Sequence, residues 1–262
     1  MKKWIYRFLI ELTNHKLLSN VIKKFAQSKI SKPFIGSYAK VYQINQNEML
    51  QELHTYTTLH DLFTRKLKAG AREIAQDENA VISPVDGVIE ECGEISIHKS
   101  IEVKGKSYSI KEMLGGEERI DKYLGGTFII LYLSPRHYHR IHSPVTGEVI
   151  ERYSLGKRSY PVNRLGLKYG RSPLAKNYRV ISEVKHGKGS LLVVKVGAMF
   201  INSIECTSPS NNWEKGEEVA YFSFGSTVVL LFEKDTFSLK KDIHIPAEVK
   251  MGDVLGFLTD KL

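Results

Sequence analysis

Two runs of strand-forming residues meet at Gly225-Ser226-Thr227, close to the C-terminus. The run before this step, Tyr221–Phe224, is mostly aromatic, and the run after it, Val228–Phe232, is β-branched or large and apolar. Such residues favour strands, whereas glycine lets the backbone turn or accept strain at low cost. We therefore expect two strands separated by a turn or a β-bulge.

The same step has a chemical interpretation, in which the protein cuts its own chain between Gly225 and Ser226. The hydroxyl of Ser226 would attack the unhindered carbonyl of Gly225, and the resulting ester would eliminate across Cα–Cβ of Ser226. Hydrolysis would leave a pyruvoyl group at the head of a new chain. A serine nucleophile needs a base, so this hypothesis requires one elsewhere in the chain.

A histidine cluster could supply that base. The apolar run Thr127–Leu133 predicts a strand, and His137, His139 and His142 follow it closely. Imidazole titrates near neutral pH, which suits a general base. The alternatives are surface histidines or a zinc site of the His-x-His type, although no partner motif supplies the further ligands that zinc needs.

Asp86 lies in a proline-initiated turn, Ser83-Pro84-Val85-Asp86-Gly87. Aspartate in such a turn commonly bonds its own backbone. It can also orient an imidazole and fix its tautomer. Under the second interpretation, Asp86, His142 and Ser226 form a triad whose nucleophile attacks the protein's own backbone.

Short strands with glycine and proline between them run from Val81 to the C-terminus. Residues 83–90 resemble residues 143–151, and residues 215–222 resemble residues 250–257. Repeated turn-and-strand units favour an α+β fold, in which N-terminal amphipathic helices precede a mostly antiparallel β barrel or sandwich with an internal pseudo-repeat. Residues 156–179 lack periodic apolar residues and predict a long loop.

The N-terminal region reads as helix. Trp4, Phe8 and Leu12 form an apolar stripe within a helix expected over residues 1–31, and a second helix is expected over residues 47–70, with Gly70 as its C-cap. Residues 1–32 hold eight basic residues and one acid. A core helix is one interpretation, and the charge favours the other, a helix lying in anionic headgroups. We therefore expect residues 1–70 to be a helical, membrane-associating region and residues 71–262 to be the catalytic β-rich domain.

The formal net charge of +9 indicates an anionic partner, either nucleic acid or a membrane surface. Basic and aromatic residues do not alternate as in nucleic-acid motifs, so we expect no nucleic-acid partner. No apolar run approaches the ~20 residues of a membrane-spanning helix. The two cysteines, Cys92 and Cys206, lie in unrelated segments, and no secretory signal is convincing. These features predict a peripheral protein on the cytoplasmic face of the cell membrane.

The chain resembles the phosphatidylserine decarboxylase proenzyme family from about residue 30 onward. The resemblance rests on four segments in the same order: Ser83–Gly87, Ser134–His142, Val196–Ile204 and Phe224–Thr227. The chain departs from the family pattern at Phe224, where leucine is usual, and at Asn202, where glycine is common. Neither departure removes a reacting atom, so both concern the shape of the pocket.

This resemblance implies cleavage between Gly225 and Ser226, into a β chain of residues 1–225 and an α chain of residues 226–262. It assigns Asp86, His142 and Ser226 to self-processing, and His139 to decarboxylation, with no metal. The cofactor would be the pyruvoyl group made from Ser226, whose ketone forms a Schiff base with the serine amine of the lipid and accepts the electrons left by carbon dioxide.

The implied substrate is phosphatidylserine in an anionic membrane, and the implied product is phosphatidylethanolamine. The implied polypeptide partners are the β and α chains of one precursor, and a homodimer is one candidate assembly. Two other functions stay open at this point. One is a lipoyl- or biotinyl-like carrier module with Lys250 near a hairpin tip, and the other is a zinc peptidase.

Overall fold

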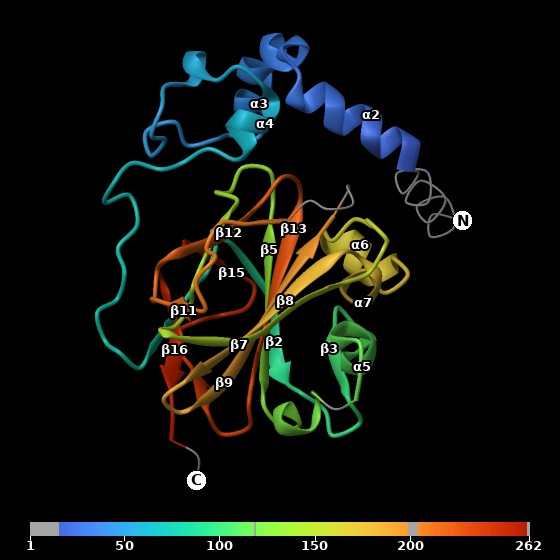
Figure 1. Cartoon of the computed structure of the whole chain (residues 1–262), viewed down its shortest axis with the longest axis vertical. Coiled ribbons are helices and arrows are strands. Elements are labelled where there is room, and N and C mark those ends of the chain that lie inside the picture. The colour runs from blue at the N-terminus through green and yellow to red at the C-terminus, as the bar shows by residue number, and fades with distance from the viewer. Residues whose placement is uncertain (1–15, 118, 199–203, 261–262) are drawn as a thin grey trace.

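The computed structural model describes residues 16–117, 119–198 and 204–260. Helices of the N-terminal region lie together at one end of a β-rich body (Figure 1). The helical elements are α2 (Lys16–Gln27), η1 (Lys29–Phe34), α3 (Ile35–Val41), η2 (Leu53–Thr55), α4 (Leu59–Phe63), α5 (Ile110–Leu114), η3 (Asp121–Tyr123), α6 (Arg164–Tyr169) and α7 (Pro173–Lys176).

The N-terminal predictions are partly right. Helix α2 confirms residues 16–27 of the first expected helix, and residues 1–15 lie outside the described residues. The second expected helix, residues 47–70, is wrong, because this stretch holds η2 and the short helix α4 in otherwise irregular chain. The Thr58 side chain caps α4 by accepting the backbone N–H of Asp61.

Packing explains why this stretch is not one helix. Met49 and Tyr56 are buried against α3, whose residues Ile35 and Ala39 complete a small separate core with Leu62. An extended chain can place these side chains around α3, whereas one straight helix could not. Gly70 does adopt a positive φ of 75°, but it lies in a later turn rather than at the end of a helix.

An eight-stranded antiparallel sheet forms the body, in the order β11-β7-β8-β9-β13-β5-β2-β15, with smaller sheets β1-β16-β14, β10-β12-β6 and β3-β4 among the described residues. The strands are β1 (Ala80–Ile82), β2 (Gly87–Glu94), β3 (Ser100–Val103), β4 (Lys106–Ser109), β5 (Thr127–Leu133), β6 (Arg140–His142), β7 (Gly147–Leu155), β8 (Arg179–His186), β9 (Gly189–Gly197), β10 (Ile204–Cys206), β11 (Asn212–Trp213), β12 (Glu218–Phe222), β13 (Ser226–Phe232), β14 (Phe237–Leu239), β15 (Ala247–Val249) and β16 (Val254–Leu258).

Strand β13 is central and buried along its whole length. Val228 and Leu230 enter one hydrophobic cluster, whereas Val229 and Leu231 enter a second cluster on the opposite face of the sheet. A strand covered on both faces reads as a continuous apolar run, which is the pattern after Ser226. The strands expected on either side of Gly225 are therefore confirmed as β12 and β13, and the expected strand Thr127–Leu133 is confirmed as β5.

The mixed α/β character and the mostly antiparallel pairing are confirmed, but the large sheet is open in the described residues. Strands β11 and β15 form its two edges, so it is not a closed barrel. The expected loop over residues 156–179 contains two short helices, α6 and α7. Asn163 caps α6 through the Gly166 N–H, and Leu167 and Leu174 fill the second cluster, which gives the segment fixed structure.

Candidate active site

Ser226 is the first residue of β13, and Gly225 lies in the bend that joins it to β12. Ser226 pairs with Leu133 of β5 on one side and Gly197 of β9 on the other. Its side chain is fully buried, and within the described residues its Oγ has no hydrogen-bond partner. A buried hydroxyl without a partner is costly, so it marks a site with another purpose than stability.

His139 is also fully buried, in the loop between β5 and β6. Its Nδ1 lies 2.9 Å from the carbonyl oxygen of His137, to which it donates, and its Nε2 has no partner within the described residues. Burial is the main cause that lowers its pKa well below the ordinary value, and the charge of Arg65 adds to this. The resting imidazole is therefore neutral, with a lone pair on Nε2.

An aromatic ring joins His139 to the Gly225–Ser226 bend. The ring of Phe63, the last residue of α4, lies 3.9 Å from the His139 ring. The same ring stacks on Phe224 at 5.7 Å between centroids. The N-terminal region thus covers the bend and the buried histidine together.

His142 ends β6 and is held at both ring nitrogens. Its Nδ1 donates to the carbonyl oxygen of Gly216 at 2.8 Å, which leaves Nε2 to accept from the Tyr138 hydroxyl at 3.2 Å. Burial lowers the pKa of His142, while the charges of Glu218 and Asp86 raise it by smaller amounts. His142 is therefore a neutral base near pH 7, and a backbone carbonyl fixes its tautomer.

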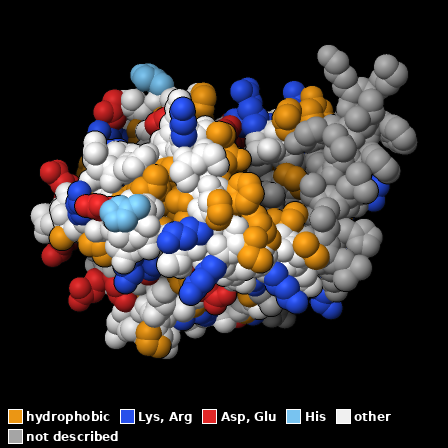
Figure 2. Space-filling model, turned by 90° about the horizontal axis from the view of Figure 1, so that it is seen from above, with side chains coloured by type: hydrophobic (Ala, Val, Ile, Leu, Met, Phe, Trp, Pro, Cys, Tyr) orange, Lys and Arg blue, Asp and Glu red, His pale blue; other side chains and the backbone are white. Residues whose placement is uncertain are grey.

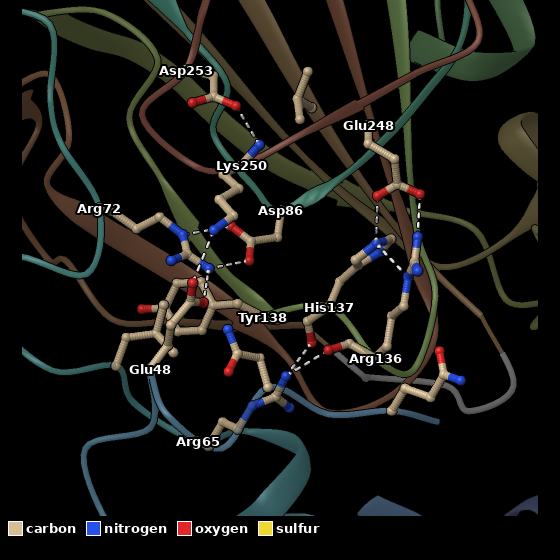
Figure 3. Close-up of a pocket in the computed structure, with 14 residues that line it drawn as sticks. Glu48, Arg65, Arg72, Asp86, Arg136, His137, Tyr138, Glu248, Lys250 and Asp253 are labelled. Carbon is tan, nitrogen blue, oxygen red and sulfur yellow. Dashed lines mark hydrogen bonds and ion pairs between the residues drawn. The ribbon is translucent and has the colours of Figure 1, made fainter. Parts of the chain in front are cut away.

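Asp86 is held by other groups than His142. Arg72 binds its carboxylate through two hydrogen bonds of 2.9 and 2.5 Å (Figure 3). The Met251 N–H also donates to Oδ1 of Asp86, at 2.8 Å. Arg72 also pairs with Glu48 at 2.9 Å. The turn of Asp86 still contacts His142 through the backbone, since the His142 N–H donates to the carbonyl oxygen of Pro84 at 2.8 Å.

A cavity of about 540 Å³ lies beside Asp86, where the N-terminal region meets the β-rich body. Figure 3 shows its charged side chains in pairs, with Arg72 turned toward Asp86 and Arg136 turned toward Glu248. His137 also contacts Glu248, at 3.3 Å. This cavity brings Asp86 and His137 together, but within the described residues no hydrogen bond joins the side chains of Asp86, His142 and Ser226 to one another.

Two arginines that sequence reasoning missed tie α4 to the histidine loop. Arg65 is buried and donates to the carbonyl oxygens of Arg136 and His137, at 2.7 and 2.9 Å. Arg140 donates to the carbonyl oxygen of Thr64 from Nε and Nη2. The sequence signal for Arg65 was its position two residues after the apolar pair Leu62-Phe63, a place where a cation needs a specific partner.

The turns at 83–87 and 143–147 make matching hydrogen bonds. Ser83 Oγ donates to the carbonyl oxygen of Val85, as Ser143 Oγ does to that of Val145. The Met251 N–H donates to Asp86 as the Lys215 N–H donates to Thr146. Two backbone hydrogen bonds also join the turns to each other. The Ile82 N–H donates to the Pro144 carbonyl oxygen, and the His142 N–H donates to the Pro84 carbonyl oxygen.

The family model described as phosphatidylserine decarboxylase matches residues 59–257, which include the histidine loop and the Gly225–Ser226 step. The chain belongs to the phosphatidylserine decarboxylase family. The resemblance inferred from the four segments is thereby confirmed. The match covers α4 and the whole β-rich body, and neither the carrier module nor the zinc peptidase accounts for the residues that it spans.

Curated relatives match the decarboxylase chain over almost its entire length. A phosphatidylserine decarboxylase proenzyme of Geobacillus sp. (strain WCH70) is 59% identical over 98% of this chain and 100% of its own. That of Anoxybacillus flavithermus is 59% identical over 100% and 98%, and that of Geobacillus kaustophilus is 56% identical over 98% and 97%.

Two further observations concern the decarboxylase as a whole. In the described stretches, no helix combines the length and the hydropathy needed to cross a membrane. The described residues also contain no group of three or more His, Cys, Asp or Glu side chains placed to hold a metal ion.

The surroundings of His142 predict a pH response. We expect His142 to titrate below pH 6.5, because burial disfavours the imidazolium. Glu218→Gln removes a negative charge that raises this pKa, so the titration should move to still lower pH. Histidine-selective NMR against pH measures the pKa of His142 in the wild-type protein and in the variant. A titration that stays in place or moves upward in the Glu218→Gln variant would contradict this account.

Proposed function

We propose that this chain is a proenzyme that cuts itself between Gly225 and Ser226 and then converts phosphatidylserine to phosphatidylethanolamine and carbon dioxide. The relatives that carry the name phosphatidylserine decarboxylase proenzyme support it across the full length of the chain. The observation that carries the proposal is the buried hydroxyl of Ser226, which has no hydrogen-bond partner among the described residues and directly follows Gly225 at the start of the central strand.

The residues around Ser226 suit a pyruvoyl group at that position. Ser226 Oγ and His139 Nε2 are both buried polar atoms without a partner in the described residues. The ring of Phe63 contacts both His139 and Phe224, which precedes Ser226 by two residues. When present, the pyruvoyl ketone supplies an electron sink for the decarboxylation of an amino acid. The hydrophobic surroundings exclude water from this position, and Phe63 holds the imidazole of His139 in place.

In the proposed self-cleavage, His142 is the general base and Ser226 is the nucleophile. The tautomer of His142 suits the role of base, because the Gly216 carbonyl oxygen holds the proton on Nδ1 and leaves Nε2 as an acceptor. Asp86 contributes by its negative charge and by the backbone bond from its turn to His142, rather than by holding the ring. The tautomer-fixing role that the sequence assigned to Asp86 therefore passes to a carbonyl group in this proposal.

His139 is assigned to the decarboxylation itself. Among the described residues its Nε2 has no hydrogen-bond partner, and the lowered pKa keeps it unprotonated at rest. In this proposal it takes up the proton that the ammonium group of the lipid serine releases, and then delivers it to the carbon from which carbon dioxide departs. A buried imidazole in contact with Phe63 is well placed to do so without exchange with bulk water.

Residues 1–70 are proposed to hold the enzyme on an anionic membrane. Large apolar side chains are exposed on the described part of this region, and Ile30, Phe34 and Val41 are 75%, 51% and 72% exposed. Figure 2, which looks onto this end of the molecule, shows hydrophobic side chains beside lysines and arginines. Apolar and basic side chains on one face suit insertion among anionic headgroups. This assignment leaves residues 71–262 as the catalytic domain.

The matching turns support two further parts of the proposal. The paired hydrogen bonds at residues 83–87 and 143–147 suggest that the β-rich domain contains two copies of one turn-and-strand unit. In this interpretation, Asp86 of one copy corresponds to Thr146 of the other, and Ile82 corresponds to His142.

The sandwich arrangement and the homodimer stay predictions. Sedimentation equilibrium of the purified protein tests the homodimer.

Variants of two histidines should separate the two reactions. We expect His142→Asn to leave the chain uncut, because the nucleophile loses its base, and His139→Asn to cut normally but lose decarboxylation by 10²-fold or more. The measurements are gel analysis of the purified chains and release of carbon dioxide from carboxyl-labelled phosphatidylserine in detergent micelles.

Two outcomes of that experiment would contradict the proposal. One is full decarboxylase activity in His139→Asn, and the other is normal self-cleavage in His142→Asn. Thermal unfolding of both variants serves as the control for folding, since asparagine keeps the polarity of the site but cannot act as a base.

Membrane association predicts a second set of variants. Ile30→Asp and Phe34→Asp together should weaken binding to phosphatidylserine-containing vesicles at least about tenfold, because burial of each side chain contributes roughly 1.5–3 kcal/mol. Ile97, on the β-rich body and 70% exposed, provides the matched control as Ile97→Asp. Vesicle co-sedimentation measures the binding. Equal loss in the control, or undiminished binding in the double variant, would refute this role.

A further inference from the structure

The carbonyl group that the proposed self-cleavage attacks already has a hydrogen-bond donor. The backbone N–H of Ala198 donates to the carbonyl oxygen of Gly225 at 2.8 Å. Ala198 directly follows β9, and its neighbour Gly197 lies opposite Ser226 in the pairing of β9 with β13. The donor therefore comes from the adjacent strand, whose register fixes its position relative to the Gly225–Ser226 bond.

A buried asparagine holds the peptide group of this donor from its other end. The Nδ2 of Asn177 donates to the carbonyl oxygen of Gly197 at 2.9 Å, and also to that of Tyr160 at 2.7 Å. The Oδ1 of Asn177 accepts the Tyr160 N–H at 2.9 Å, so the side chain has a fixed orientation. The peptide group that joins Gly197 to Ala198 is thus hydrogen-bonded at its C=O to Asn177 and at its N–H to Gly225.

This arrangement has a chemical consequence during cleavage. As Ser226 Oγ bonds to the carbonyl carbon, its proton passes to the base and the C=O electron pair moves onto the Gly225 oxygen. That pair returns as the C–N bond breaks, the nitrogen of Ser226 takes a proton, and an ester results. A donor at 2.7–3.1 Å stabilises the negative oxygen, and a hydrogen bond to a charged acceptor is about twice as strong as one to a neutral group.

We propose that the Ala198 N–H is the oxyanion donor of the self-cleavage, and that Asn177 is the residue that positions it. This inference rests on the proposed function of the Gly225–Ser226 bond. Asn177 acts through the peptide plane, since a hydrogen bond to the Gly197 carbonyl both orients the amide and polarises it. Removal of the N–H should therefore slow cleavage while the nucleophile and the base stay in place.

The test removes that single N–H. Cell-free synthesis with lactic acid in place of Ala198 turns the amide into an ester and keeps the methyl side chain. We expect the rate of self-cleavage to fall about 10²–10³-fold, the loss typical of one oxyanion donor. The matched control places lactic acid at Ala80, whose N–H donates to the Asp77 carbonyl at 2.9 Å instead. We expect its cleavage rate to stay within about threefold of the wild-type rate.

A side-chain variant tests the positioning role. Asn177→Asp keeps the size of the side chain but replaces the Nδ2 donor with an oxygen, and we expect cleavage to slow at least about tenfold. When combined with the ester at residue 198, it should add little, because both changes act on one hydrogen bond. A merely structural asparagine would instead give additive losses.

The outcomes are distinct for this inference and for the proposed function. Wild-type cleavage in the Ala198 ester, or equal losses in the Ala198 and Ala80 esters, would overturn the assignment of the oxyanion donor. A wild-type chain that stays uncut in the same synthesis would overturn the proposed self-cleavage, and this inference with it. Circular dichroism of each product confirms that the chain has folded.

Discussion

The pairing of β13 with strands on both of its sides is the constraint on which the site depends. Ser226 is the first residue of this strand, and it is fixed by Leu133 of β5 and by Gly197 of β9. Hydrophobic clusters cover both faces of the strand beyond it. The sheet therefore fixes the backbone of Ser226 directly after the Gly225 carbonyl group that its hydroxyl would attack.

Burial then sets the chemistry of the groups around this strand. His139 and His142 lie inside the protein, which lowers their pKa values and keeps both imidazoles neutral. Carbonyl groups of His137 and Gly216 fix which nitrogen carries the proton in each. Backbone geometry therefore determines which nitrogen of each ring carries the lone pair, and the two imidazoles lie in separate surroundings.

The N-terminal region belongs to the site as well as to the expected membrane surface. Phe63 packs on His139 and Phe224, and Arg65 binds the carbonyl groups of the histidine loop. A displacement of α4 would therefore also change the packing of Phe224 and His139 next to the bend before Ser226. The elements α2, η1 and α3 precede α4 in the chain, and they carry the exposed apolar side chains.

The sequence predicted individual strands, because their apolar runs are local, but it did not predict how distant segments pack. The strand Thr127–Leu133 and the strands around Gly225 could be read from their apolar runs, and the family from four short motifs. The helix expected over residues 47–70 failed, because packing against α3 outweighs helical propensity there. The link from Arg72 to Asp86 and the bond from Ala198 to Gly225 join residues far apart in sequence, and no periodicity encodes such contacts.

The most direct test of the account is the intact mass of the purified wild-type protein. We expect two chains that separate between Gly225 and Ser226, with the smaller one resistant to N-terminal sequencing. Its mass should show that a pyruvoyl group has replaced the serine, with the loss of one molecule of ammonia. A single uncut chain, or a small chain that begins with an ordinary serine, would contradict the account.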